Sequence, residues 1–226
     1  MLEVIKKDLI LNRNVMLLNT VVFTGILVVV AVWLSESPPT RLFAGFAGLM
    51  MAFLPAITVT REDRFNATAL GCSLPVRRKT IVRARFVLSV GTALLGLVGT
   101  FLLVSLLPHS HYRVGDLFDR GPLVTALTVI AIALSLLLPF ILRFGMNGVL
   151  IFLVATQVLG VLLLTVVSVA GFAQHREIVG QIVAGFVRLR ELTGPAAFSG
   201  LMAAVLLALL TLSYLVSARV FENREL

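Results

Sequence analysis

Charged residues are scarce in this sequence. Asp, Glu, Lys and Arg make up 13% of its 226 residues, 59% are hydrophobic, and the mean hydropathy is +1.05. These values lie far outside the range of soluble globular domains, so a membrane protein is predicted. A chain of this length has room for about six spans of roughly 20 residues each. No separate soluble domain is expected.

Cysteine and lysine are also rare. The single Cys72 excludes a disulfide within the chain and a thiolate metal site. None of the three lysines, Lys6, Lys7 and Lys79, follows a glycine, so the chain has no G-K-[ST] phosphate-binding loop. The paired aspartates or H-E-x-x-H of an intramembrane protease are absent as well. We therefore predict no enzyme activity and no cofactor on this chain, and any energy it uses must come from another polypeptide.

Six uncharged stretches predict six transmembrane helices, in an all-α integral membrane protein with a single transmembrane domain over residues 1–226. The predicted spans are residues 15–34, 42–60, 86–107, 122–142, 147–169 and 198–216. None of them, as bounded here, contains Asp, Glu, Lys, Arg or His. Carriers driven by protons or sodium keep such a group at membrane depth. An ion-coupled secondary carrier is therefore the less favoured alternative.

Several shorter segments flank these spans. Residues 1–14 place Leu2, Ile5 and Leu9 on one helical face, which predicts an interfacial helix leading into the first span. Helical spacing of apolar residues within 170–197 predicts a re-entrant or interfacial helix between spans 5 and 6.

Residues 108–121 are expected to form a polar loop. Its His109 and His111 are conceivable metal ligands, although solvated loop residues are the favoured interpretation and any role of the two histidines stays open.

Small residues recur every four positions in two spans. In the second span they are Ala44, Gly48 and Ala52, and in the sixth they are Gly200, Ala204 and Ala208. Such spacing predicts a smooth helix face that allows close helix contact.

The basic residues are distributed unevenly about the spans. With six spans, thirteen of them fall on the side of the two termini and six on the other side. Positive charge marks the cytoplasmic side, so both termini are predicted to be cytoplasmic. The formal charge of +8 would suggest nucleic acid for a soluble chain. Beside apolar spans it indicates contact with anionic lipid instead, and no nucleic-acid partner is expected.

The longest polar segment between spans is residues 61–85. It has a helix–break–helix pattern, in which Gly71 to Ser73 interrupt the helix and Pro75 starts a new one. We expect it to dock a soluble partner, because lipid phosphates would repel its acidic pair, Glu62 and Asp63. Anchoring to lipid alone, at about 1 kcal/mol per basic residue, is the alternative. The segment carries seven of the nineteen basic residues: Arg61, Arg64, Arg77, Arg78, Lys79, Arg83 and Arg85.

The chain resembles the permease subunits of bacterial type-2 ABC exporters, in particular the small six-span group that includes the phenol-soluble modulin exporter permeases. The resemblance covers the whole chain in architecture, and about twenty-five residues carry its motif. These are IKKDL (Ile5 to Leu9), the pair Glu62 and Asp63, LPV-x-R-K (Leu74 to Lys79) and IV-x-AR-F (Ile81 to Phe86). Arg77 stands where the family usually has a small hydroxyl residue, and this departure makes the second half of the segment more basic.

The resemblance implies a coupling helix that seats in a groove of a cytoplasmic ABC ATPase, with ATP and Mg bound on that partner. It also implies a second permease, identical or not, paired through the smooth helix faces, and a location in the bacterial inner membrane. The substrate path would be apolar and hydroxyl-lined, which suits an amphipathic peptide or a lipid-like compound. The alternative class is a membrane scaffold or immunity-type protein that transports nothing. The predicted coupling residues are Glu62, Asp63, Arg64, Phe65, Leu74, Pro75, Arg77, Arg78 and Lys79.

Overall fold

The structure is a computed structural model of the chain. It describes residues 2–33, 39–64, 78–107, 110, 112–144, 147–152, 154–155, 157–158, 185, 188 and 194–222. In this described part the secondary structure is helical, with no strand. The main helices are α1 (Leu2–Trp33), α2 (Thr40–Arg64), α4 (Arg78–Leu106), α5 (Val114–Phe118), α6 (Arg120–Phe144) and α9 (Pro195–Glu222).

Four stretches among the described residues are long and apolar enough to cross a membrane. They are Asn12–Val32, Lys79–Leu106, Arg120–Phe144 and Gly200–Phe221. A shorter apolar stretch, Thr40–Pro55, lies in α2. The chain divides into two compact units, one formed by Met1–Val149 with Leu209–Leu226 and the other by Leu150–Ala208.

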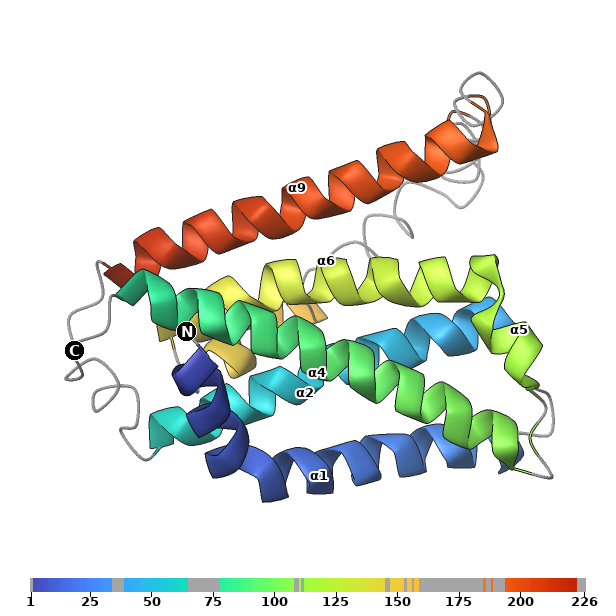
Figure 1. Ribbon diagram of the computed structural model, residues 1–226, viewed down its shortest axis with the longest axis horizontal. Coiled ribbons are helices and arrows are strands. Elements are labelled where there is room, and N and C mark those ends of the chain that lie inside the picture. Colours follow the sequence, from blue (N-terminus) through green and yellow to red (C-terminus); the bar gives the residue numbers. More distant parts are fainter. Residues whose placement is uncertain are drawn as a thin grey trace. The chain divides into compact units, whose positions relative to one another are not determined.

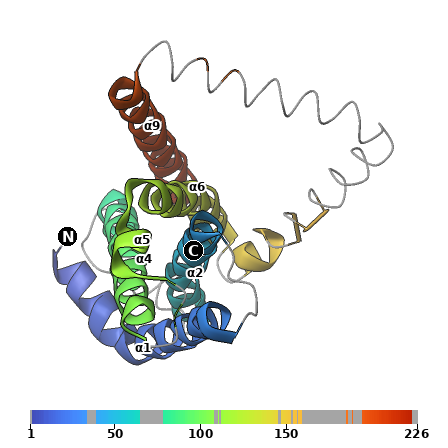
Figure 2. The same ribbon diagram turned by 90° about the vertical axis from the view of Figure 1, so that its right-hand side faces the viewer.

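In the first unit, α1 and α4 run in one direction and α2 and α6 in the other (Figure 1), and Figure 2 shows the same helices end-on. Gly45 near the start of α2 lies against Thr125 near the start of α6. We call the end of this unit that holds the start of α4 and the end of α2 the basic end, and the opposite end the α5 end.

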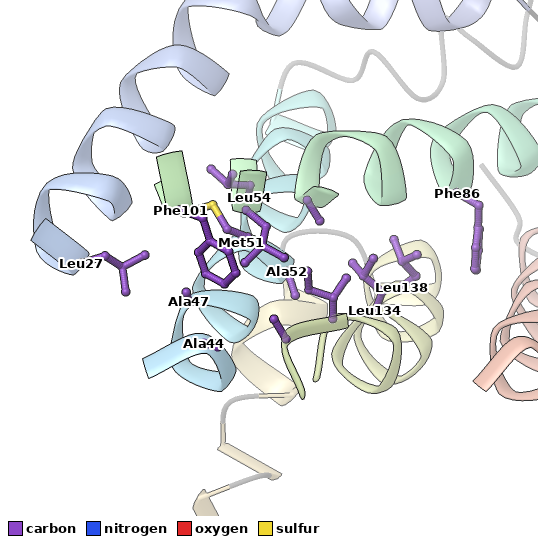
Figure 3. Close-up of a cluster of buried hydrophobic side chains, with 14 of the residues drawn as sticks. Leu27, Ala44, Ala47, Met51, Ala52, Leu54, Phe86, Phe101, Leu134 and Leu138 are labelled. Atoms are coloured by element: carbon purple, nitrogen blue, oxygen red, sulfur yellow. The ribbon is translucent and has the colours of Figure 1, made fainter. Parts of the chain in front are cut away.

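The α2 helix is the centre of the core. Its buried Met51 and Leu54 lie against Gly96 of α4, and Leu134 and Leu138 of α6 belong to the same cluster (Figure 3). Apolar side chains on α1, α2, α4, α6 and the second half of α9 thus share one hydrophobic core, which fixes where each helix end lies.

The small-residue face of α2 is used within the chain. Ala44 and Ala52 are fully buried, and a Cβ built on Gly48 would be 2.7 Å from the main-chain oxygen of Ala126 in α6. The predicted close helix contact therefore exists. The expectation that this face pairs two permeases is wrong, because α6 of the same chain covers it.

The amino-terminal segment and the first predicted span form one continuous helix. Figure 1 shows the first turns of α1 at an angle to the rest of that helix. The first turns contain the exposed Lys6, and the apolar stretch begins after them, at Asn12.

Helix α4 begins at Arg78, eight residues before the third predicted span. Its first turns are packed into the core, where Arg85 is 6% exposed and Val82 is fully buried. The predicted spans contain no Asp, Glu, Lys, Arg or His, but the helix that forms the third one carries a buried arginine just before it.

The segment expected to be a polar loop caps the α5 end of the core. The Tyr112 ring stacks on Phe43 of α2 with centroids 4.4 Å apart, and Phe118 makes an edge contact with Phe101 of α4 at 5.7 Å. Leu117, between them in sequence, is fully buried. A loop rich in His and Asp therefore also supplies three apolar anchors.

The short connection predicted after the fourth span is consistent with what the structure describes. Helix α6 ends at Phe144, and helical residues resume at Asn147. A Cβ on Gly148 would overlap the main-chain oxygen of Phe140, so the backbones approach closely at this turn. The predicted helix within residues 170–197 falls largely outside the described residues, as do His109, His111 and Cys72.

Candidate functional site

The basic end contains the described part of the predicted coupling segment. Glu62, Asp63 and Arg64 form the last turn of α2, so they continue the helix whose middle forms the core. Arg78 opens α4, and Lys79 is exposed one residue later. The end of α2, with the acidic part of the motif, and the start of α4, with its basic part, thus both lie at the basic end of the unit (Figure 1). Four predicted coupling residues, Phe65, Leu74, Pro75 and Arg77, lie outside the described residues.

The first turns of α4 have two different sides. Lys79 and Arg83 are exposed, whereas Ile81 and Val82 are buried in the core. This alternation follows from the 3.6-residue period of the helix, which returns the apolar side chains to the same side. A basic surface and a core contact are therefore built on the same two turns.

Aromatic contact joins these turns to α9. The ring of Phe86 meets Tyr214 edge-on, with centroids 5.6 Å apart and planes at 87°. One residue earlier in α9, the Ser213 hydroxyl donates a hydrogen bond of 2.7 Å to the main-chain oxygen of Ser135 in α6. Ala218 and Phe221 continue the contact of α9 with the core. The start of α4 is thus connected through α9 to α6.

Arg85 is a buried charged residue that the span prediction placed outside the third span. It is buried on the helix face that also holds Ile81 and Ser89, both buried, which lie four residues before and after it. Burying a guanidinium is costly unless other groups of the protein interact with it. The sequence signal for this burial is the four-residue spacing of Arg85 from Ile81 and Ser89. The charge of the arginine argued against a buried position.

The end of α6 adds a further cation to the same end. The Arg143 guanidinium lies over the Phe144 ring, 5.0 Å from its centroid. Arg219 lies in the last turn of α9. The positive charge that predicted the orientation is therefore gathered at the ends of three helices, α4, α6 and α9.

Polar groups inside the helices are used for packing. The Thr24 hydroxyl of α1 and the Thr100 hydroxyl of α4 are 3.1 Å apart and buried. Among the described residues, no group of three or more His, Cys, Asp or Glu side chains could hold a metal ion. The described interior therefore consists of apolar and hydroxyl groups, together with the buried Asn12 and Arg85.

Comparison with known proteins points to one family. The family model described as "ABC-2 family transporter protein" matches residues 3–222, nearly the whole chain. No curated protein and no solved structure matches the chain significantly. The match spans the helices that form the basic end and the core, together with the apolar stretches long enough to cross a membrane. The chain therefore belongs to the ABC-2 family of transporter proteins, as a multi-pass membrane permease that associates with an ABC ATPase.

Proposed function

We propose that this chain is the permease subunit of an ATP-driven exporter of the bacterial inner membrane, in the group of the phenol-soluble modulin exporters. A separate cytoplasmic ABC ATPase, which binds ATP and Mg, drives it through residues 61–85. Glu62, Asp63 and Arg64 on α2, together with Arg78 and Lys79 on α4, form the described part of the contact. Phe65, Leu74, Pro75 and Arg77 complete it.

The observation that carries this proposal is the double role of the start of α4. Lys79 and Arg83 are exposed, while Val82 and Phe86 on the same turns pack against the core. A helix of 29 residues is about 43 Å long at a rise of 1.5 Å per residue. A displacement imposed on its basic start is therefore transmitted along the helix towards the α5 end.

The direction of α9 supports six crossings. Helix α6 ends at the basic end, and α9 ends there too, because Tyr214 contacts Phe86 near the start of α4 and Phe221 is buried in the core. The chain between them has to return across the membrane before α9 begins. We propose that residues 147–169 make this fifth crossing, which leaves both termini in the cytoplasm.

The interior of the helices favours an amphipathic substrate. The described interior holds apolar side chains and buried hydroxyls, such as the Thr24–Thr100 pair that bonds within the protein, and we expect the substrate path to be lined by the same kinds of groups. An amphipathic peptide or a lipid-like compound has matching surfaces. A sugar would need many more polar partners, and an ion would need a coordinating ring.

A second permease, identical or not, completes the transporter in this proposal. The small-residue face of α2 is covered by α6, so pairing has to use another helix. The corresponding face of α9 is exposed at Gly200, Ala204 and Ala208. This face is therefore our candidate for the contact between the two permeases.

The test is charge reversal at the end of α2. The variant Glu62→Lys/Asp63→Lys is co-expressed with the partner ABC ATPase, and copurification and ATP turnover are measured. We expect both to fall severalfold, because two positive charges replace the acidic pair at the proposed contact. Arg113→Glu, an exposed charge reversal at the α5 end, is the matched control and leaves both readouts unchanged.

Unchanged copurification and turnover in the double variant would remove Glu62 and Asp63 from the contact. A scaffold would bind a partner but show no ATP-dependent transport. A secondary carrier would respond to a proton or sodium gradient without ATP.

A further inference from the structure

The α5 end carries an open pocket of about 520 Å³ within the first unit. Three elements form it, since the start of α2, the short helix α5 and the start of α6 each contribute residues. The lining residues are Pro39, Thr40, Arg41, Gly115, Asp116, Asp119 and Pro122. The pocket is open rather than enclosed, so it is a surface site.

Both signs of charge meet in this pocket. The Arg41 guanidinium lies over Gly121, where a Cβ would be 3.0 Å from Nε and 3.1 Å from Nη2. The absence of a side chain at position 121 thus makes room for the cation. The carboxylates of Asp116 and Asp119 belong to the same lining. The pocket therefore combines one guanidinium with two carboxylates.

Asp116 and Asp119 each make a hydrogen bond within the protein, and both remain part of the pocket lining. Asp116 Oδ2 accepts a hydrogen bond of 3.2 Å from the Arg113 main-chain nitrogen. Asp119 accepts the main-chain N–H of Leu123 at 3.1 Å, but through its own main-chain oxygen. Asparagine at position 116 can still accept the hydrogen bond from Arg113 through its side-chain oxygen, and asparagine at position 119 leaves the main-chain bond in place.

The pocket lies where apolar helix surface begins. Directly after Arg41, the Leu42 side chain is 66% exposed, and Val124 near the start of α6 is 53% exposed. The stretch from Arg120 onward is apolar enough to cross a membrane. Charged groups next to the end of an exposed apolar helix surface lie at the depth of the lipid headgroups. The acyl chains then lie beside the apolar part of the helices.

We propose that this pocket binds the headgroup of a phospholipid carrying a phosphate and a primary ammonium, that is, the phosphatidylethanolamine class. The phosphate pairs with Arg41, and the ammonium pairs with Asp116 and Asp119. The ammonium has three N–H donors for the two carboxylates, whereas a choline headgroup has none. A purely anionic headgroup would meet two like charges beside one opposite charge. The site is independent of the ATPase contact at the other end of the helices.

The experiment uses the purified full chain and native mass spectrometry. The protein is titrated in detergent with phosphatidylethanolamine, phosphatidylcholine and phosphatidylglycerol of identical acyl chains, and the retained lipid is quantified. We expect phosphatidylethanolamine to be retained about five- to tenfold better than either of the others, the scale of a partly exposed charge-assisted hydrogen bond. Asp116→Asn/Asp119→Asn should abolish this preference, whereas Arg41→Gln should lower the retention of all three lipids, because each of them carries the phosphate. Gly121→Ala, which displaces the Arg41 guanidinium by a few tenths of an ångström, should lower the retention of all three lipids to a smaller extent.

Two controls make the result decisive. Arg143→Gln removes a cation at the basic end and keeps the preference, and circular dichroism with gel filtration confirms that every variant is folded. An excess of soluble glycerophosphoethanolamine should displace the lipid poorly, because it lacks acyl chains. Equal retention of the three lipids, an unchanged preference in the double asparagine variant, or full displacement by the soluble headgroup would each overturn the proposal.

Discussion

The main chain of Gly48 in α2 lies directly against the main-chain carbonyl of Ala126 in α6. A Cβ on Gly48 would be 2.7 Å from that oxygen and 3.2 Å from the Ala126 Cα. Contact below 3.0 Å is not sustained by real side chains, so no residue larger than glycine fits without moving a helix. Close approach of this kind replaces the hydrophobic driving force that is missing between helices in lipid.

Substitution of Gly48 by alanine should destabilise the protein by about 1–3 kcal/mol, because the added methyl group overpacks a backbone contact. The measurement is the free energy of unfolding in mixed micelles. Gly99→Ala in α4 is the matched control, since a Cβ there meets nothing within 4 Å. Equal stability of the two variants would show that the contact at Gly48 is looser than described.

The sequence predicted this close contact but not its partner. The spacing of Ala44, Gly48 and Ala52 identifies a smooth face because helix periodicity is local. Which helix covers the face depends on tertiary packing, and Ala126 is one of many small residues in the chain. A face assigned to contact between two permeases was therefore found inside one chain.

The Thr24–Thr100 pair should contribute a modest coupling energy between α1 and α4. Their hydroxyls are 3.1 Å apart and buried. Interhelical hydrogen bonds in membranes are worth about 0.6 kcal/mol on average, with a maximum of about 1.7 kcal/mol. A double-mutant cycle with Thr24→Val and Thr100→Val should return a coupling in that range.

Thr92 supplies the control for this cycle. Its hydroxyl donates to the main-chain oxygen of Leu88, 2.9 Å away in its own helix. A cycle that pairs Thr24→Val with Thr92→Val should give no coupling, since the two residues share no bond. Coupling of equal size in both cycles would mean that the valines act through general packing.

Tyr112 should make stability depend on alkaline pH. Burial raises the pKa of its phenol above the ordinary value of 10.0, because the apolar surroundings disfavour the phenolate. In the unfolded chain the phenol loses its proton at a lower pH than in the native protein. The free energy of unfolding should therefore fall as the pH rises above about 10.

Tyr112→Phe keeps a ring that can stack on Phe43 and removes the titrating group. Its free energy of unfolding should fall less than that of the wild type between about pH 9 and about pH 11. Chemical unfolding at the two pH values is the measurement, and phenolate absorbance reports the titration itself. Parallel loss of stability in both proteins would assign the pH dependence to other groups.

The α5 end shows where sequence reasoning stopped. Composition marked residues 108–121 as a polar loop, yet Tyr112, Leu117 and Phe118 anchor it to the core. Three apolar residues in a short polar segment carry no clear periodicity, so only the fold reveals their contact with α2 and α4. Arg85 was missed for the opposite reason, because its charge placed it outside the apolar span that its own helix continues.

Cysteine accessibility should reveal which side of the membrane each end of the helices faces. Cys72 is the sole cysteine and lies in the predicted cytoplasmic segment. A membrane-impermeant maleimide should label it only after cells are permeabilised. In a Cys72→Ser background, Gly115→Cys in α5 and Ala197→Cys at the start of α9, both exposed positions, should be labelled in intact cells.

These positions separate the possible topologies because each follows a different number of crossings. Labelling at position 115 reports three crossings from the amino terminus, and labelling at position 197 requires five. If position 197 were protected in intact cells while position 115 was labelled, residues 147–169 would not cross the membrane. Labelling of Cys72 from outside would instead place the basic end away from the ATPase, and coupling through residues 61–85 would be impossible.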